Sequence, residues 1–107
     1  MAAENMNHVD FEKKIIQEGR VALVDFWAPW CGYCRRISAA YDQIARENPD
    51  ILVVKVNIDE EPDLAAQYHV EVIPTLMLFQ NSEELDQVVA PGSKAQIQEF
   101  LKKHLEV

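Results

Sequence analysis

The chain has 107 residues, which is enough for one buried core, and we expect a single domain over residues 1–107. Hydrophobic residues make up 49% of the chain and charged residues 26%, a composition that excludes disordered and collagen-like classes. The net charge of −8 repels phosphate backbones and anionic membrane surfaces, so we expect neither nucleic acid nor membrane as a partner.

The first helix is predicted between Asn7 and Gly19. Phe11 and Ile15 lie one helical turn apart, with Asn7 upstream as a capping residue and Gly19 downstream as a stop. Val21–Trp27 follows as a strand. It is apolar on both of its alternating faces apart from one acid, a pattern typical of a central strand that is covered on both sides.

The next segments predict a helix and a second central strand. Apolar residues repeat with the spacing of one buried helix face and stop before Asn48-Pro49; they are Ile37, Ala40, Tyr41, Ile44 and Ala45. Ile51–Ile58 then shows the same two-sided apolar pattern as the first strand. A strand, a helix and a strand in this order predict a parallel crossover.

The second half of the chain predicts a short helix, a hairpin and a last helix. Pro62 suits the first turn of a helix, since proline lacks the amide hydrogen that this position leaves unpaired. Thr75–Gln80 and Leu85–Ala90 are expected to form an antiparallel hairpin at the sheet edge, with its turn at Asn81-Ser82. Ser93–Gln96 matches a capping box ahead of the last helix. The whole order indicates a compact α/β sandwich.

The only two cysteines, Cys31 and Cys34, lie where the first central strand gives way to its helix. Cys31 should therefore sit at the helix N-terminus, where unpaired amides and the macrodipole favour a thiolate and lower the pKa of the thiol. Arg35 and Arg36 follow directly and should favour an anion further. Cys34 lies one turn deeper, close enough to attack a mixed disulfide formed at Cys31.

Other uses of this cysteine pair fit the sequence less well. A structural disulfide across so short a loop would stabilise the fold little, because loop-closure entropy grows with loop length. A structural zinc site needs four ligands, and His8, His69 and His104 are scattered along the chain. Residues 1–10 hold no apolar core of a signal peptide, so we expect a reduced, cytoplasmic protein with a catalytic pair and no metal.

Several segments in order resemble the thioredoxin family. They are Val24–Ala28, Trp30–Gly32, Lys55–Asp59 and Ile73–Leu76. The resemblance covers about Val9 to Leu105 and implies a thioredoxin-like fold, with a central mixed β-sheet flanked by helices on both faces. It also implies a protein-disulfide reductase without a bound cofactor, in which Cys31 attacks the substrate disulfide and Cys34 resolves the mixed disulfide.

Asp25 places a carboxylate in a strand that is expected to be buried on both faces, which is costly unless the group is paired or protonated. One interpretation is a structural ion pair with Lys55. The resemblance implies instead a buried acid below the dithiol that has a raised pKa and takes the proton from Cys34, while Lys55 modulates it. The two interpretations are compatible.

The resemblance also implies a substrate groove around the cysteines. Its expected members are Trp30, Gly32, Tyr33, Ile73, Pro74 and Ala90. Pro74 would be cis and pack beside the cysteines, so that the backbone of Ile73 can pair with an extended substrate, and Trp30 would form an exposed rim. The implied partners are disulfide-containing proteins as substrates and a thioredoxin reductase as electron donor, with the chain itself expected to be a monomer.

Some positions depart from the family's pattern. Tyr33 stands where thioredoxins usually have proline, and Gly32-Tyr33 resembles the pair found in some bacterial disulfide isomerases. Ala90 and Ser82 stand where glycine is usual, and the short segment before Asn7 predicts a reduced or missing first edge strand. The sequence therefore leaves open a disulfide isomerase or oxidase of the same fold, and a binding module without redox turnover.

Overall fold

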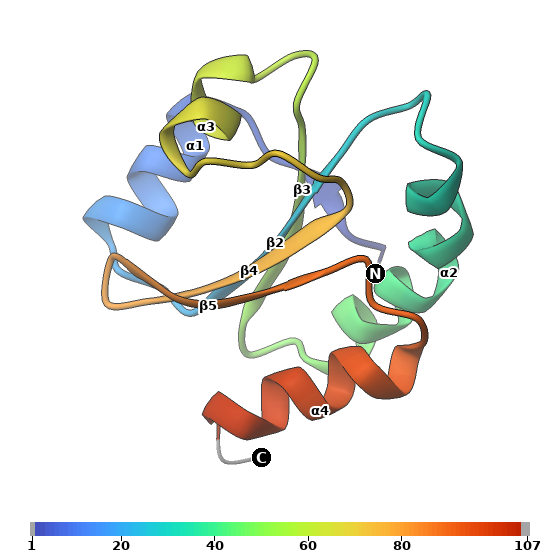
Figure 1. Cartoon of the computed structure of the whole chain (residues 1–107). Helices are drawn as coiled ribbons and strands as arrows, with labels where there is room; N and C mark the ends of the chain where they lie inside the picture. Colours follow the sequence, from blue (N-terminus) through green and yellow to red (C-terminus); the bar gives the residue numbers. More distant parts are fainter. Residues whose placement is uncertain (1, 106–107) are drawn as a thin grey trace.

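A five-stranded mixed sheet in the order β1-β3-β2-β4-β5 forms the centre of the protein (Figure 1). The computed structural model describes residues 2–105. The strands are β1 (Glu4–Asn5), β2 (Ala22–Trp27), β3 (Leu52–Asn57), β4 (Thr75–Gln80) and β5 (Glu83–Val89). β1 and β2 run parallel to β3, whereas β4 is antiparallel to both β2 and β5.

Helices cover both faces of this sheet, as expected (Figure 1). They are α1 (His8–Asp10), the π-helical segment η1 (Phe11–Gln17), α2 (Gly32–Glu47), α3 (Pro62–Gln67) and α4 (Lys94–Leu105). α2 and α4 pack on one face, and α1, η1 and α3 on the other. The predicted thioredoxin-like α/β architecture is confirmed. Among residues 2–105, no helix has both the length and the apolar character needed to cross a bilayer.

The first helix differs from its prediction in its winding. Asn7 caps it as expected, since its Oδ1 accepts the amide hydrogen of Asp10 at 2.8 Å. Beyond Asp10 the backbone widens into η1, with the amide of Glu18 donating to the carbonyl of Lys13 at 3.0 Å. Phe11 and Ile15 are both buried, as their spacing predicted. Their spacing of four residues places them on one face of an α-helix or a π-helix, so it could not distinguish the two.

The first edge strand is reduced rather than missing. β1 has two residues, Glu4 and Asn5, which pair with Val54 and Lys55 of β3. The amide of Met6 extends the pairing by donating to the carbonyl of Lys55 at 2.7 Å.

The turn and cap expected in the second half are present. Asn81 and Ser82 have φ angles of 55° and 71°, the left-handed pair that closes a two-residue hairpin between β4 and β5. Ser93 caps α4 by accepting the amide hydrogen of Gln96 at 3.2 Å. The capping box is incomplete, because the Gln96 side chain accepts from the amide of Gly92 instead of that of Ser93.

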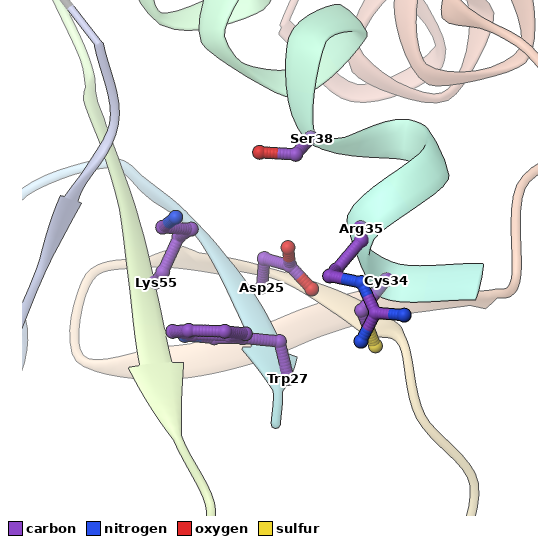
Figure 2. Close-up of a pocket in the computed structure, with 6 residues that line it drawn as sticks. All are labelled: Asp25, Trp27, Cys34, Arg35, Ser38 and Lys55. Carbon is purple, nitrogen blue, oxygen red and sulfur yellow. The ribbon is translucent and has the colours of Figure 1, made fainter. Parts of the chain in front are cut away.

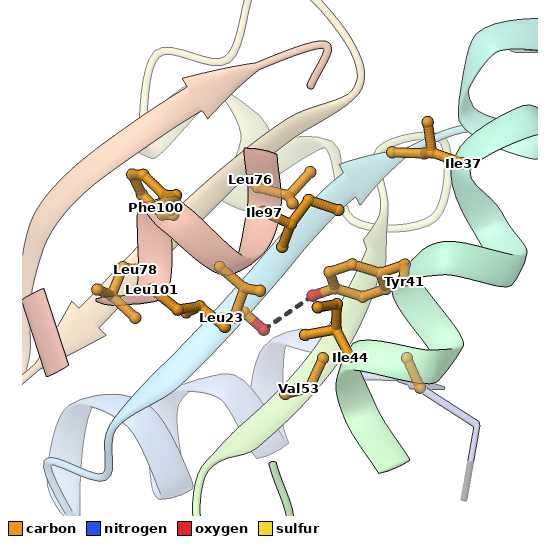
Figure 3. Close-up of a cluster of buried hydrophobic side chains, with 11 residues drawn as sticks. Leu23, Ile37, Tyr41, Ile44, Val53, Leu76, Leu78, Ile97, Phe100 and Leu101 are labelled. Carbon is orange, nitrogen blue, oxygen red and sulfur yellow. Dashed lines mark hydrogen bonds between the residues drawn. The ribbon is translucent and has the colours of Figure 1, made fainter. Parts of the chain in front are cut away.

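Tyr41 anchors α2 to the sheet inside the core between α2, α4 and the strands (Figure 3). Its ring is fully buried, and its hydroxyl lies 3.0 Å from the carbonyl oxygen of Leu23 in β2 and 2.7 Å from that of Val54 in β3. A buried phenol needs a partner of this kind. The contact fixes α2 over the two central strands and thereby places its first turn above the end of β2.

Candidate active site

Cys31 and Cys34 are joined as a disulfide at the start of α2, with their Cα atoms 5.3 Å apart. Cys31 is the N-cap residue, and its Sγ accepts the amide hydrogen of Cys34 at 3.1 Å. The turn before the helix is closed by the amide of Cys31, which donates to the carbonyl of Ala28 at 3.1 Å. Both cysteines are buried, with 8% of Cys31 and 4% of Cys34 exposed, so only the edge of the dithiol reaches the surface.

Asp25 lies in the middle of β2 and is only 2% exposed. Its Oδ1 is buried and has no hydrogen-bond partner among the described residues. Burial raises the pKa of Asp25 from 3.8 to about 7, and the positive charge of Lys55 offsets part of this rise. A carboxyl of this kind can gain and lose a proton near neutral pH.

Lys55 does not form the ion pair with Asp25 that was one interpretation of the sequence. The two residues are partners in the β2–β3 register, but within residues 2–105 no contact of 4 Å or less joins their charged atoms. The ammonium group lies instead over the ring of Trp27, 4.7 Å from its centroid. Lys55 therefore acts on Asp25 through its field rather than through a hydrogen bond.

A cavity of about 260 Å³ connects these groups (Figure 2). Its lining residues are Asp25, Trp27, Cys34, Arg35, Ser38 and Lys55. Arg35 is held at the mouth of the site, because its guanidinium donates to the carbonyl of Pro29 at 2.7 Å. The cavity gives the carboxyl of Asp25 and the side chain of Cys34 a common space that water can reach.

The peptide bond between Ile73 and Pro74 is cis, as the resemblance implied. The carbonyl oxygen of Ile73 lies 4.0 Å from the Sγ of Cys31, which places this loop beside the dithiol. The carbonyl of Pro74 accepts the amide hydrogen of Ala90 at 2.8 Å. The structure thus brings Ile73, Pro74 and Ala90 together next to the cysteines, although they come from distant parts of the chain.

Trp30 and Gly32 form the exposed side of the site. Trp30 is 65% exposed, and its ring nitrogen donates to the carboxylate of Asp59 at 3.0 Å, which fixes the ring at the rim. A Cβ added at Gly32 would have Arg35 as its nearest neighbour, at 4.0 Å. A side chain at position 32 would therefore point into open space at the surface, so close packing does not require a glycine here.

Tyr33 reaches across the site from the first turn of α2. Its hydroxyl lies 3.2 Å from the carbonyl oxygen of Ala90 and 3.1 Å from that of Pro91. The guanidinium of Arg36 lies over its ring, 4.9 Å from the centroid. Arg36 was expected to act on the thiolate, and its side chain engages the tyrosine ring instead.

Sequence reasoning missed two residues that line the cavity, Trp27 and Ser38. Trp27 was placed at the end of a strand and within the segment that resembles the family, but it was given no role in the site, although the last residue of a strand that precedes a reactive turn lies close to that turn. Ser38 follows Cys34 by four residues, so the two side chains share a helix face, and this spacing was a usable signal. Among the described residues, no group of three metal-ligating side chains is present.

The fold and the site together define a class of protein. A dithiol at the N-terminus of a helix, beside a cis-proline loop and above a buried carboxyl, is built for thiol–disulfide exchange. The comparisons with known proteins agree, since the Thioredoxin family model matches residues 2–103. The chain therefore belongs to the thioredoxin family, and it is a thiol–disulfide oxidoreductase.

Known proteins resemble the chain along nearly its whole length. It is 42% identical to thioredoxin 1 of Nostoc sp. (strain PCC 7120), over 97% of this chain and 98% of that protein. It is 39% identical to the chloroplastic M-type thioredoxin of Chlamydomonas reinhardtii, over 94% of this chain and 72% of that protein. The X-ray structure of Fasciola hepatica thioredoxin is similar with a TM-score of 0.84 and 32% identity, covering 95% of this chain and 98% of that one.

Proposed function

We propose that the protein is a protein-disulfide reductase in which Cys31 is the attacking cysteine and Cys34 the resolving one. The observation that carries this proposal is the position of Cys31 as the N-cap of α2, with its sulfur accepting the amide hydrogen of Cys34. In the reduced protein the same amide and the positive end of the helix dipole stabilise a thiolate at Cys31.

In the first step the Cys31 thiolate attacks one sulfur of a substrate disulfide. A bond forms between Cys31 and that sulfur, the substrate's sulfur–sulfur bond breaks, and the other substrate sulfur leaves as a thiolate that takes a proton from water. Cys31 is the more exposed of the two cysteines and lies next to the Ile73 carbonyl, which supports its role as the entry point.

In the second step the thiolate of Cys34 attacks the sulfur of Cys31, the bond between Cys31 and the substrate breaks, and the second substrate sulfur leaves as a thiolate that takes a proton from water. Two electrons have then passed to the substrate, and Cys31 and Cys34 are left as a disulfide. Cys34 must lose its proton for this attack. Asp25 shares the cavity with Cys34 and titrates near neutral pH, so we assign the ionised carboxylate as proton acceptor, through water in the cavity, with Lys55 tuning its charge.

The substrate would be an extended segment of a protein that contains a disulfide. It would pair with the backbone of Ile73, between the rim at Trp30 and Gly32 on one side and Pro74, Tyr33 and Ala90 on the other. A thioredoxin reductase in the cytoplasm would reduce the Cys31–Cys34 disulfide again, and the protein would act as a monomer.

The reduction potential tests the direction of transfer, since Gly32-Tyr33 leaves an isomerase or oxidase as the second candidate. We expect a value near −270 mV, roughly that of a reductase, when the protein is equilibrated in a thiol redox buffer. The protein should also reduce insulin with dithiothreitol as electron source. A potential above roughly −180 mV would favour the second candidate. A variant lacking both cysteines distinguishes a redox enzyme from a binding module. A reductase, isomerase or oxidase would lose its function in this variant, whereas a binding module would keep it.

A further inference from the structure

Tyr33, the residue that departs from the family's usual proline, connects two segments that are far apart in the chain. Its hydroxyl lies 3.2 Å from the Ala90 carbonyl and 3.1 Å from the Pro91 carbonyl, and the Tyr33–Ala90 contact spans 57 residues. A phenol has one proton to donate, so the two carbonyl oxygens share it. The contact ties the first turn of α2 to the connection between β5 and α4.

The tyrosine ring is held in place for this contact. It packs, partly buried, against the core on the α2 face and against the small cluster that contains the cysteines. The guanidinium of Arg36 lies over the ring, 4.9 Å from its centroid. The hydroxyl is therefore directed at its two acceptors before any substrate arrives.

The other end of the connection is tied to the cis-proline loop. Ala90 has a φ angle of +48°, and its amide donates to the Pro74 carbonyl at 2.8 Å. The carbonyl of Ile73, in the same loop, lies 4.0 Å from the Sγ of Cys31. Hydrogen bonds thus link Tyr33 to Ala90 and Ala90 to Pro74. Together with the approach of Ile73 to Cys31, these contacts surround the dithiol.

We propose that Tyr33 is a positioning residue whose hydroxyl fixes the groove wall formed by Ala90 and Pro91, and thereby sets how tightly the site accepts protein disulfides. The proposal rests on the function proposed above. A wall that is already ordered loses less conformational freedom when an extended chain docks, so binding is tighter. A small disulfide that touches only the sulfur of Cys31 gains nothing from this wall.

The variant Tyr33→Phe tests the proposal, because it keeps the ring and the contact with Arg36 and removes only the hydroxyl. With insulin as substrate and dithiothreitol as electron source, we expect KM to rise roughly three- to tenfold, the value of one hydrogen bond. We expect kcat with insulin, and the rate with 5,5′-dithiobis(2-nitrobenzoic acid), to change by less than about twofold.

A matched control is Tyr68→Phe, which removes a phenol from the opposite face of the sheet, where the ring packs against Phe11 and Phe79. It should leave KM and kcat with insulin unchanged, and also the rate with 5,5′-dithiobis(2-nitrobenzoic acid). A second measurement is hydrogen exchange at the amide of Ala90. This amide should exchange faster in Tyr33→Phe than in the wild-type protein, and at the wild-type rate in Tyr68→Phe.

The possible outcomes are distinguishable. An unchanged KM for insulin together with unchanged exchange at Ala90 would overturn the role of the hydroxyl. An equal loss with insulin and with the small disulfide would also overturn it, because Tyr33 would then act on the dithiol and not on docking. If the wild-type protein reduces neither disulfide, the proposed reductase function is wrong and this inference fails with it.

Discussion

The carboxyl of Asp25 is held where an ionised group is poorly solvated. It is 2% exposed, its Oδ1 lacks a hydrogen-bond partner among the described residues, and Lys55 offsets the cost of ionisation only in part. A protein selected for stability alone would place an apolar residue at this position. In the function proposed above, Asp25 uses the cavity that it shares with Cys34 to accept a proton, and this use would offset the stability that its burial costs.

This burial predicts the pH dependence of stability of the oxidised protein. The unfolded carboxyl of Asp25 releases its proton near pH 3.8, whereas the folded one keeps it until about pH 7. The free energy of unfolding should therefore fall as the pH rises through this window, by up to about 4 kcal/mol from this group. Asp25→Asn removes the effect and should be more stable than wild type by about 2–4 kcal/mol at pH 8.

Urea unfolding of the oxidised proteins at several pH values measures this difference. The stabilities of wild type and Asp25→Asn should nearly coincide at pH 4, where the folded carboxyl is protonated. A constant difference between the two proteins from pH 4 to pH 8 would show that Asp25 does not titrate in this range.

At the scale of the elements, α2 carries the two cysteines at one end and packs against the hydrophobic core along its length. Its first turn carries Cys31 and Cys34, and two turns later Tyr41 places its hydroxyl between the carbonyls of Leu23 and Val54. The position of the dithiol above β2 therefore depends on a buried polar contact as well as on apolar packing (Figure 3).

The variant Tyr41→Phe should destabilise the protein by about 1–3 kcal/mol, because it leaves the two buried carbonyls without this donor. The ring remains, so the loss reports the hydroxyl alone. Chemical unfolding at pH 7 measures it, with Tyr68→Phe as a matched loss of a phenol outside this core. Equal stability of Tyr41→Phe and wild type would show that the contact contributes nothing to the anchoring of α2.

The sequence predicted the elements whose periodicity is clear. The central strands and α2 were found because their apolar residues recur with the period of a strand or a helix. β1 was less well defined because two residues carry no period, and the π-helical winding of η1 was missed because Phe11 and Ile15 share a face in either helix.

The site was only partly predictable for a different reason. Cys31, Cys34 and Asp25 could be found because they stand in one local motif or in a conspicuously polar position within an apolar strand. The contact from Tyr33 to Ala90 spans 57 residues and is made to a backbone carbonyl, which any residue possesses. Side-chain identity therefore carried no signal for it, and it required the structure.

On the scale of the whole molecule, part of the excess negative charge lies on the edge strand β5. β5 is the last strand of the sheet, and it exposes the apolar side chains of Leu85 and Val89, which are 42% and 46% exposed. The outer edge of such a strand has no partner within the sheet and can pair with another chain, and charges on the edge oppose this. Glu83 and Glu84 lie on the same strand and are both exposed.

Neutralising this edge should promote association without changing the chemistry. We expect the double variant Glu83→Gln/Glu84→Gln to scatter more light than wild type at the same concentration, while its rate of insulin reduction stays within about twofold. The matched control is Glu60→Gln/Asp63→Asn, which removes the same charge away from the edge. Equal scattering by the two variants would show that net charge, and not its place on β5, keeps the chains apart.

The most direct test of the central claim is to trap the mixed disulfide. Cys34→Ser, incubated with a protein disulfide, should accumulate a covalent complex that mass spectrometry detects and maps to Cys31. Cys31→Ser should form no such complex and should lack turnover. Trapping of substrate on Cys34 in the Cys31→Ser variant, or equal turnover by the two variants, would contradict the assignment of Cys31 as the attacking cysteine and Cys34 as the resolving one.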